Sequence, residues 1–387
     1  TEDSIARHIR PLFSRSLART ELYLANHSLG RPLDQTAHDV KEALDHWYEK
    51  MDDAWEPWLA EMDAFRTRIA RLINCPRPDA IIPKTAAGQG LRAVLNAHGS
   101  PGTPAVAKPI HVLATRGEFD SIDFILRTYA AKGRARITWI DPDDSGLFNP
   151  DKIAQAITMT VDLVVVSPVV FATGQILSGL KAIAAAIHAV GGHLLLDCYH
   201  AAGVIPINFN DSGADFAIGG SYKYTRGGPG ACWLAVHPRH LIDQPRPVSR
   251  RHALSTLDTG WFAKHDKWLF ERQDEPTLAP GGDAWLESTP AILPFYQARA
   301  GLEFTLAVGV DRLRKYNLEQ QTYLRDRLTS HAVKVWNFDS QNQPGHGAFL
   351  LVPAPDTTSA VAALKRRGLS LDARPTPTRS QSEHPPA

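Results

Sequence analysis

The stretch VDLVVVSPVVFATGQILSGLKAIAAAIHAVGGHLLLD, residues 161–197, decides the fold class of this 387-residue chain. The apolar runs VDLVVVS and HLLLD predict two buried strands, and the residues between them recur at helical spacing: Leu180, Ile183, Ile187 and Val190. A glycine pair, Gly191 and Gly192, ends that helix. Apolar strands that alternate with helices are typical of a mostly parallel sheet covered on both faces, so we predict an α/β fold.

The same pattern extends to both sides of this stretch. Residues 110–114 and 136–140 predict further strands of the sheet, and residues 40–73 predict one or two helices that carry three tryptophans. Beyond about residue 290 a long helical segment, 292–328, precedes a predicted strand at 345–355 and a helix-and-strand region, 357–374. This change of pattern predicts a smaller α+β domain at the carboxyl-terminal end.

We therefore divide the chain into four parts. An amino-terminal segment, 1–35, packs on the small domain; the large domain spans 36–289 and the small domain 290–374. The last residues, 375–387, lack core-forming side chains and predict a loose tail.

Composition excludes several classes of partner. Lys and Arg total 42 against 41 Asp and Glu, so the chain offers no broad field to nucleic acid or to an anionic membrane. No apolar run is long enough to span a bilayer. The three cysteines, Cys75, Cys198 and Cys232, form no CxxC pair and suit a reducing compartment, so we expect a cytoplasmic protein.

An acid and a lysine are the residues most suggestive of chemistry. Asp197 closes the run HLLLD, and Lys223 lies in SYKYTRGGPG between two strand-like runs. Taken singly, Asp197 is more often a helix cap or turn residue, and a lysine is more often a solvated surface group. Together at the carboxyl ends of strands they favour pyridoxal 5′-phosphate, whose protonated ring nitrogen needs a carboxylate and whose aldehyde needs a desolvated lysine.

Two neighbouring residues support the same interpretation. His200 and Tyr222 supply an imidazole and a hydroxyl beside this pair, where they could bind phosphate or relay protons. Each also has a plain structural alternative, a histidine at a helix start and a packed aromatic residue. No pattern of metal ligands accompanies them.

Three segments carry a family resemblance: VVVSPVVFATGQ at 164–175, DCYHAAG at 197–203 and ADFAIGGSYKYTRGGPGACWLAVHPRH at 214–240. They resemble the motifs of kynureninases of the bacterial type, members of the class V aminotransferase superfamily with the fold type I architecture of pyridoxal phosphate enzymes. The resemblance extends from about residue 24 to about residue 328. It implies a homodimer with shared active sites, and a hydrolase (EC 3.7.1.3) of tryptophan catabolism that cleaves L-kynurenine to anthranilate and L-alanine.

The resemblance also assigns residues to the cofactor. It implies that Lys223 binds the cofactor covalently, that Asp197 holds the ring nitrogen, and that His200 and Tyr222 lie on the phosphate side, with Tyr222 also transferring protons. Phe119 matches the aromatic residue that stacks on the ring. The resemblance implies further cofactor contacts. They come from the loop residues Thr85, Ala86 and Ala87, from Trp261, which would reach the cofactor of a neighbouring subunit, and from Thr289.

Substrate contacts are implied for four residues, Trp55, Ser288, Thr289 and Arg374. Trp55 and Thr289 match positions that favour kynurenine over its 3-hydroxy form, and Arg374 in DARPTPTRS matches the arginine that binds the substrate carboxylate. The chain departs from the family at Ala87, which replaces a hydroxyl residue, at Ile122, which replaces an acid, and at Ser288, which replaces a glycine.

Other functions remain open from the sequence. The same cofactor set would serve an aminotransferase, a cysteine desulfurase or another C–S lyase, and a catalytically altered relative would keep the fold without the activity. A desulfurase needs a mobile thiolate, and the contexts of the three cysteines argue against one.

Overall fold

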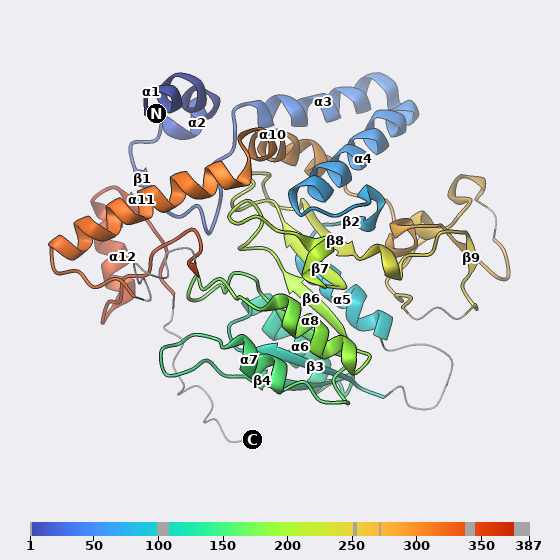
Figure 1. Ribbon diagram of the computed structural model, residues 1–387. Coiled ribbons are helices and arrows are strands. Elements are labelled where there is room, and N and C mark those ends of the chain that lie inside the picture. Colours follow the sequence, from blue (N-terminus) through green and yellow to red (C-terminus); the bar gives the residue numbers. More distant parts are fainter. Residues whose placement is uncertain (1, 99–107, 251–253, 271, 337–344, 375–387) are drawn as a thin grey trace.

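The computed structural model describes residues 2–98, 108–250, 254–270, 272–336 and 345–374, and its centre is a seven-stranded sheet (Figure 1). The strands lie in the order β2-β8-β7-β6-β5-β3-β4. Only β8 runs antiparallel to its neighbours, so the predicted mostly parallel sheet is confirmed. The bounds in chain order are β2 Ile81–Lys84, β3 Ile110–Thr115, β4 Ala135–Ile140, β5 Leu163–Val166, β6 His193–Asp197, β7 Phe216–Gly220 and β8 Cys232–Val236.

Helices cover this sheet because its strands are apolar along their whole length. Every residue of β3, β5, β7 and β8 is buried, which requires cover on both faces. One helix packs on β7 and β8, another on β4 and another on β6. The helices between the strands are α5 Ala87–His98, α6 Asp120–Ala131, α7 Pro150–Gln155 and α8 Leu180–Ala189.

A second group of helices lies at one end of the sheet (Figure 1). The predicted helical region at 40–73 forms two helices, α3 Gln35–Lys50 and α4 Trp55–Leu72, and both pack on α10 Leu293–Val308. The segment predicted as one long helix is in fact two, α10 and α11 Val310–Ser330. Gly309 separates them with φ of 88°, a left-handed conformation that the helix cannot continue through.

The carboxyl-terminal part differs from the prediction in one element. Residues 345–355 form no strand; His346 and Leu351 make only isolated bridges, to Gln175 and Trp336. Prolines at 353 and 355 remove backbone donors that a ladder would need. The helix α12 Thr357–Arg366 and the short strand β11 Leu369–Ser370 are present.

The amino-terminal segment joins this part, since β1 Leu22–Tyr23 pairs in parallel with β11. The division of the chain into four parts stays a prediction, and its tail, 375–387, lies outside the described residues. The remaining short α-helices and strands are α1 Glu2–Ser4, α2 Ser14–Leu17, α9 Phe209–Ser212 and the antiparallel pair β9 Arg246–Pro247 and β10 Thr277–Leu278. Within the described ranges, no helix has the length and apolar character needed to cross a bilayer.

Gly30 fixes the amino-terminal segment against the turn that carries Lys223. The Gly30 N–H donates to the carbonyl oxygen of Tyr222 at 2.7 Å. A Cβ atom at this position would overlap the carbonyl oxygen of Lys223, which is backbone and cannot move aside freely. Only glycine therefore allows this close approach.

We predict that Gly30→Ala lowers the thermal unfolding midpoint and slows cofactor uptake, because the extra methyl forces the two backbones apart at a cost of about 1–3 kcal/mol. Gly345→Ala is the matched control, since a Cβ there meets no atom within 4 Å. Differential scanning calorimetry of both variants checks this. Equal midpoints for the two variants would show that the amino-terminal segment does not press on the turn.

Candidate active site

Asp197, Tyr222 and Lys223, three of the residues singled out from the sequence, converge at the carboxyl ends of β6 and β7. Asp197 is the last residue of β6 and pairs with Ile218 of β7. Beyond β7, a turn closed by the N–H of Gly227, which donates to the carbonyl of Ser221 at 2.6 Å, carries Tyr222 and Lys223. Adjacent parallel strands thus deliver the acid and the lysine to one edge of the sheet.

Lys223 is buried among aromatic rings and paired with an imidazole. Its Nζ lies 2.7 Å from Nε2 of His200, and only 4% of the residue is exposed. Three ring centroids lie within 5.0–5.7 Å of Nζ, those of Phe119, Tyr199 and Tyr222. Burial lowers the pKa of Lys223 to about 8, although the charge of Asp197 acts in the opposite direction. The amine is therefore far more available as a nucleophile than a surface lysine.

His200 is held neutral by its surroundings. Burial lowers its pKa well below the ordinary value, and the positive charge of Lys223 acts in the same direction. Its Nε2 faces the ammonium of Lys223 and so accepts, which places the imidazole hydrogen on Nδ1. That Nδ1 is buried and bonds to none of the described residues. A buried donor without a partner indicates a place for a ligand acceptor.

Asp197 is a buried carboxylate that forms no ion pair with any described residue. It is 5% exposed, and its Oδ1 accepts a hydrogen bond from the N–H of Tyr199 at 3.0 Å. Desolvation raises its pKa. A charge buried in this way is stabilised by a protonated nitrogen, so the site fits the ring of pyridoxal phosphate on the chemistry of its own groups.

A second buried acid, Glu118, lies behind this site and was not found from the sequence. Its two carboxyl oxygens accept hydrogen bonds of 2.6 Å from the hydroxyls of Thr115 and Ser167. Burial raises its pKa to about 7, and the charge of Asp197 contributes. Ile122, which stands where the resembling family carries an acid, is itself buried.

Backbone donors at the start of α5 suit a phosphate. The N–H groups of Thr85 and Ala86 both donate to Oε1 of Gln89, at 2.9 and 3.3 Å, and Ala87 is the first residue of the helix. Thr85 and Ala86 are exposed. An oxygen acceptor thus already lies where an anion would bind a helix start.

Arg374 reaches the site from the far end of the chain. Its Nη1 donates to the carbonyl of Phe171 at 3.1 Å, and its guanidinium lies 3.9 Å from the centroid of the Phe171 ring. The same ring lies 5.6 Å from His200 and 4.9 Å from Phe119. Burial lowers the pKa of Arg374, and the side chain also meets Asp372 at 3.4 Å.

Several aromatic and charged neighbours were not found from the sequence, because single side chains in loops carry no periodic signal. They are Tyr199, Phe171, Phe349, His27 and Asp372. His27 stands three residues before Gly30, and burial lowers its pKa to about 4, with the charge of Arg374 next in size. His27 and Gly30 both lie in YLANHSLG, residues 23–30, near the start of the family resemblance.

The other residues predicted for cofactor and substrate, Trp55, Trp261, Ser288 and Thr289, lie in a second group, apart from Lys223. The indole N–H of Trp261 donates to Oγ1 of Thr289 at 3.2 Å, and Trp268 lies between Trp261 and Trp55, at 5.4 and 6.2 Å from their rings. Ser288 is exposed beside Thr289. Among the described residues, no hydrogen bond, ion pair or ring contact joins this group to Lys223.

The aminotransferase class-V profile matches residues 35–372, a range that includes Asp197 and Lys223. The chain belongs to this family. Its curated relatives include proteins named kynureninase from Bacillus cereus (strain ZK / E33L), 27% identical over 91% of this chain and 81% of the relative, and from Xanthomonas campestris pv. campestris (strain B100), 27% identical over 84% and 76%. The resemblance to kynureninases within the class V superfamily is thereby confirmed.

Solved structures confirm the fold type I architecture. A cysteine desulfurase from Thermococcus onnurineus NA1 superposes with a TM-score of 0.76 at 17% identity, covering 94% of this chain and 86% of that one. A mutant of C-DES with glycine covalently linked to its PLP cofactor gives 0.78 at 18% identity, covering 93% and 90%. Family and fold together support the prediction of pyridoxal phosphate as the cofactor.

The pKa of Lys223 predicts the pH dependence of cofactor capture. Only the neutral amine reacts, so the rate should rise with pH up to about 8 and then level off, whereas a lysine of ordinary pKa, 10.5, would keep accelerating. Stopped-flow absorption after mixing the cofactor-free protein with pyridoxal phosphate measures this. Asp197→Asn should move the plateau to lower pH, because the Asp197 charge raises the pKa of Lys223. A rate that still climbs at pH 10 contradicts the buried lysine.

Proposed function

We propose that this chain is a pyridoxal phosphate-dependent hydrolase that cleaves L-kynurenine to anthranilate and L-alanine. The observation that carries the proposal is the joint placement of Asp197, the Lys223–His200 pair and Arg374 around one aromatic-lined site. The curated relatives named kynureninase support this reaction over others of the class V family.

Pyridoxal phosphate supplies an electron sink to such a reaction when it is bound. Lys223 would hold it and then act as the base that removes the α-proton of the substrate, a role for which a pKa of about 8 is well placed. Asp197 would keep the ring nitrogen protonated. Phe119 would stack on the ring, a contact worth about 0.5–1.5 kcal/mol beyond area burial.

The phosphate side would be formed by backbone and side chains together. The backbone N–H groups of Thr85, Ala86 and Ala87 would donate to the phosphate oxygens. The phosphate would thereby replace Oε1 of Gln89, which now accepts from Thr85 and Ala86. His200 and Tyr222 would add an imidazole and a phenol. Ala87 lacks a hydroxyl, so only its backbone would contribute.

Tyr222 would also donate the proton that completes alanine. Desolvation raises the pKa of this phenol, so it stays protonated at neutral pH and is able to donate. Arg374 would bind the substrate carboxylate in a bidentate pair, with its guanidinium plane oriented by the ring of Phe171.

The group around Trp268 supports a homodimer with shared active sites. Large apolar side chains are exposed in this group and beside it: Trp47, Trp268, Leu269 and Phe270. Such a patch is typical of an interface. Trp261 would reach the partner's phosphate, and Trp55, Ser288 and Thr289 would contact the partner's substrate. A sedimentation coefficient for a monomer at micromolar concentration would contradict this arrangement.

The cysteines argue against the desulfurase alternative. Cys75, Cys198 and Cys232 are all buried, and burial raises the pKa of each thiol. A desulfurase needs a reactive thiolate at low pKa. Three buried free thiols also suit the reducing cytoplasm, where we expect the protein to act.

The proposed reaction is tested by anthranilate fluorescence after mixing the protein, pyridoxal phosphate and L-kynurenine. We expect anthranilate and alanine in equal amounts. Lys223→Ala should abolish both turnover and the visible absorption of the lysine-bound cofactor, because no other described lysine lies in the site. Pyruvate, sulfide or amino-group transfer without anthranilate would instead assign the chain to another class V reaction.

Arg374→Ala should lower kcat/KM for kynurenine by roughly 10- to 150-fold, the equivalent of about 1.5–3 kcal/mol for a hydrogen bond to a charged group. Arg374→Lys should recover part of this loss. Arg366→Ala, an exposed arginine at the end of α12, is the matched control. Steady-state kinetics that leave Arg374→Ala equal to Arg366→Ala would remove Arg374 from substrate binding.

A further inference from the structure

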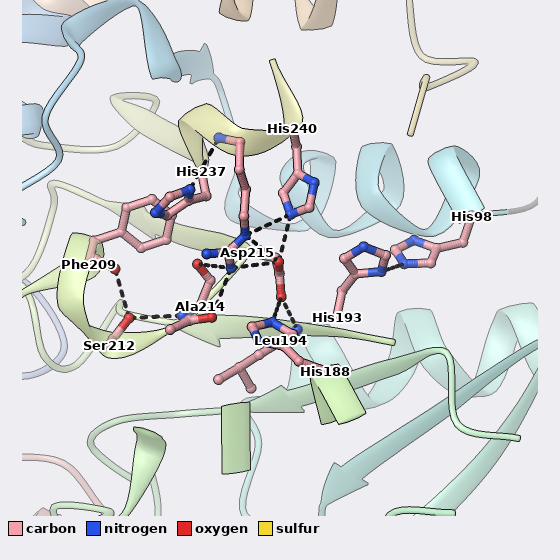
Figure 2. Close-up of polar contacts among 12 residues, drawn as sticks. His98, His188, His193, Leu194, Phe209, Ser212, Ala214, Asp215, His237 and His240 are labelled. Carbon is pink, nitrogen blue, oxygen red and sulfur yellow. Dashed lines mark hydrogen bonds and ion pairs between the residues drawn. The ribbon is translucent and has the colours of Figure 1, made fainter. Parts of the chain in front are cut away.

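Five histidines lie near one another and near the buried Asp215 (Figure 2). They are His98, His188, His193, His237 and His240. His193 begins β6, Asp215 directly precedes β7, and His240 ends the 3₁₀ turn Pro238–His240. Asp215 is 1% exposed. Because β6 and β7 are parallel and Asp197 ends β6, this cluster lies at the amino ends of the strands and has no part in the site described above.

Three members of the cluster have the spacing of metal ligands. One ligand atom each from His193, Asp215 and His240 lies within 4.8 Å of the other two. The rings of His193 and His240 are 5.1 Å apart, and Nε2 of His240 lies 2.6 Å from Oδ1 of Asp215. Two imidazoles and a carboxylate are a ligand set that zinc prefers, whereas calcium and magnesium prefer oxygen alone.

The hydrogen bonds of His98 settle which nitrogen of His193 is available. Nδ1 of His98 lies 2.9 Å from the carbonyl of Val94, so it must carry the hydrogen, and Nε2 of the neutral ring accepts. That Nε2 lies 3.0 Å from Nδ1 of His193, which therefore donates. Nε2 of His193 is left with a lone pair, engages no described residue, and faces Asp215 and His240 in Figure 2.

The hydrogen bond from Nδ1 of His193 to His98 is typical of metal sites. In such sites the nitrogen of a histidine that does not bind the metal donates to a fixed acceptor. Asp215 is held in the same way. Its Oδ2 accepts from the N–H of Leu194 and from His188, each at 2.8 Å, and its Oδ1 accepts from Arg239 at 2.7 Å. The carboxylate is thus oriented before any ion arrives.

Arg239 opposes a cation, since its guanidinium already neutralises much of the Asp215 charge. The guanidinium repels every divalent ion equally, so any selection comes from the ligands. Two imidazoles favour zinc and its neighbours in the first transition row over calcium and magnesium.

We propose that His193, His240 and Asp215 bind one zinc ion, with water in the remaining position. Zinc takes the place of the hydrogen on Nε2 of His240, which moves to Nδ1 or leaves to solvent. The hydrogen bond of Nε2 to Asp215 and its 3.3 Å contact with Arg239 are then lost, and His193 moves inward. The ion ties the starts of β6 and β7 to the 3₁₀ turn after β8, so its role is structural. Kynurenine cleavage proceeds without it.

The test is a zinc titration of the full chain loaded with pyridoxal phosphate, after dialysis against a chelator, with a chromophoric chelator as competitor. We expect about one zinc per chain. His193→Gln and His240→Gln should each weaken binding by at least about tenfold, the scale on which ligand and outer-contact losses act. His331→Gln, an exposed histidine after α11, is the matched control and should bind as the parent does.

Circular dichroism and turnover of each variant show that folding and the active site are intact. Binding that is unchanged in both His193→Gln and His240→Gln, or no zinc bound by the parent protein at saturating zinc, overturns the proposal. If either variant fails to fold, anomalous scattering at the zinc edge from crystals of the parent protein decides. A peak between the three side chains supports the site, and a peak elsewhere or none at saturating zinc refutes it.

Discussion

The buried carboxylate of Asp197 is the constraint on which the rest of the active site depends. An ionised acid without a directly bonded cation costs several kcal/mol in a protein interior, and among the described residues Asp197 accepts a hydrogen bond only from the N–H of Tyr199. A fold keeps such a group where a ligand compensates it. The parallel pairing of β6 with β7 sets its position and carries the Lys223 turn to the same edge.

The other charges of the site are arranged around this acid. Burial makes the amine of Lys223 reactive, while the Asp197 charge limits the shift of its pKa. Neutral His200 accepts from the lysine without adding charge. Glu118, whose pKa burial raises to about 7, is satisfied by two hydroxyls, so it need not compete for the cation that Asp197 requires. Arg374 adds a positive charge beside the ring of Phe171, where we propose that the substrate carboxylate binds.

Much of the sheet and its chemistry could be predicted because both leave local signals. Apolar runs and the glycine pair at 191–192 mark the strand–helix–strand unit, and Asp197 and Lys223 follow strands directly. The break at Gly309 was missed because the apolar pattern continues through it. The strand at 345–355 was wrongly predicted because its apolar run suggested one, whereas His346 and Leu351 make only isolated bridges and two prolines follow.

Long-range contacts explain what the sequence alone does not give. Arg374 donates to the carbonyl of Phe171, 203 residues away in the sequence, and no local sequence pattern at either residue predicts this contact. The histidines around Asp215 likewise come from separate segments, and only the fold assembles them. Trp55 and Trp261 lie in one aromatic group through Trp268, a residue with no sequence signal of its own.

The most direct test of this account is the ¹⁵N chemical shift of the ring nitrogen in the protein loaded with ¹⁵N-labelled pyridoxal phosphate. If Asp197 is compensated by that nitrogen, the resonance lies in the protonated range at neutral pH and moves to the unprotonated range in Asp197→Asn. An unprotonated nitrogen in the parent protein, or the same shift in both, would contradict the claim that the buried acid exists to hold the ring.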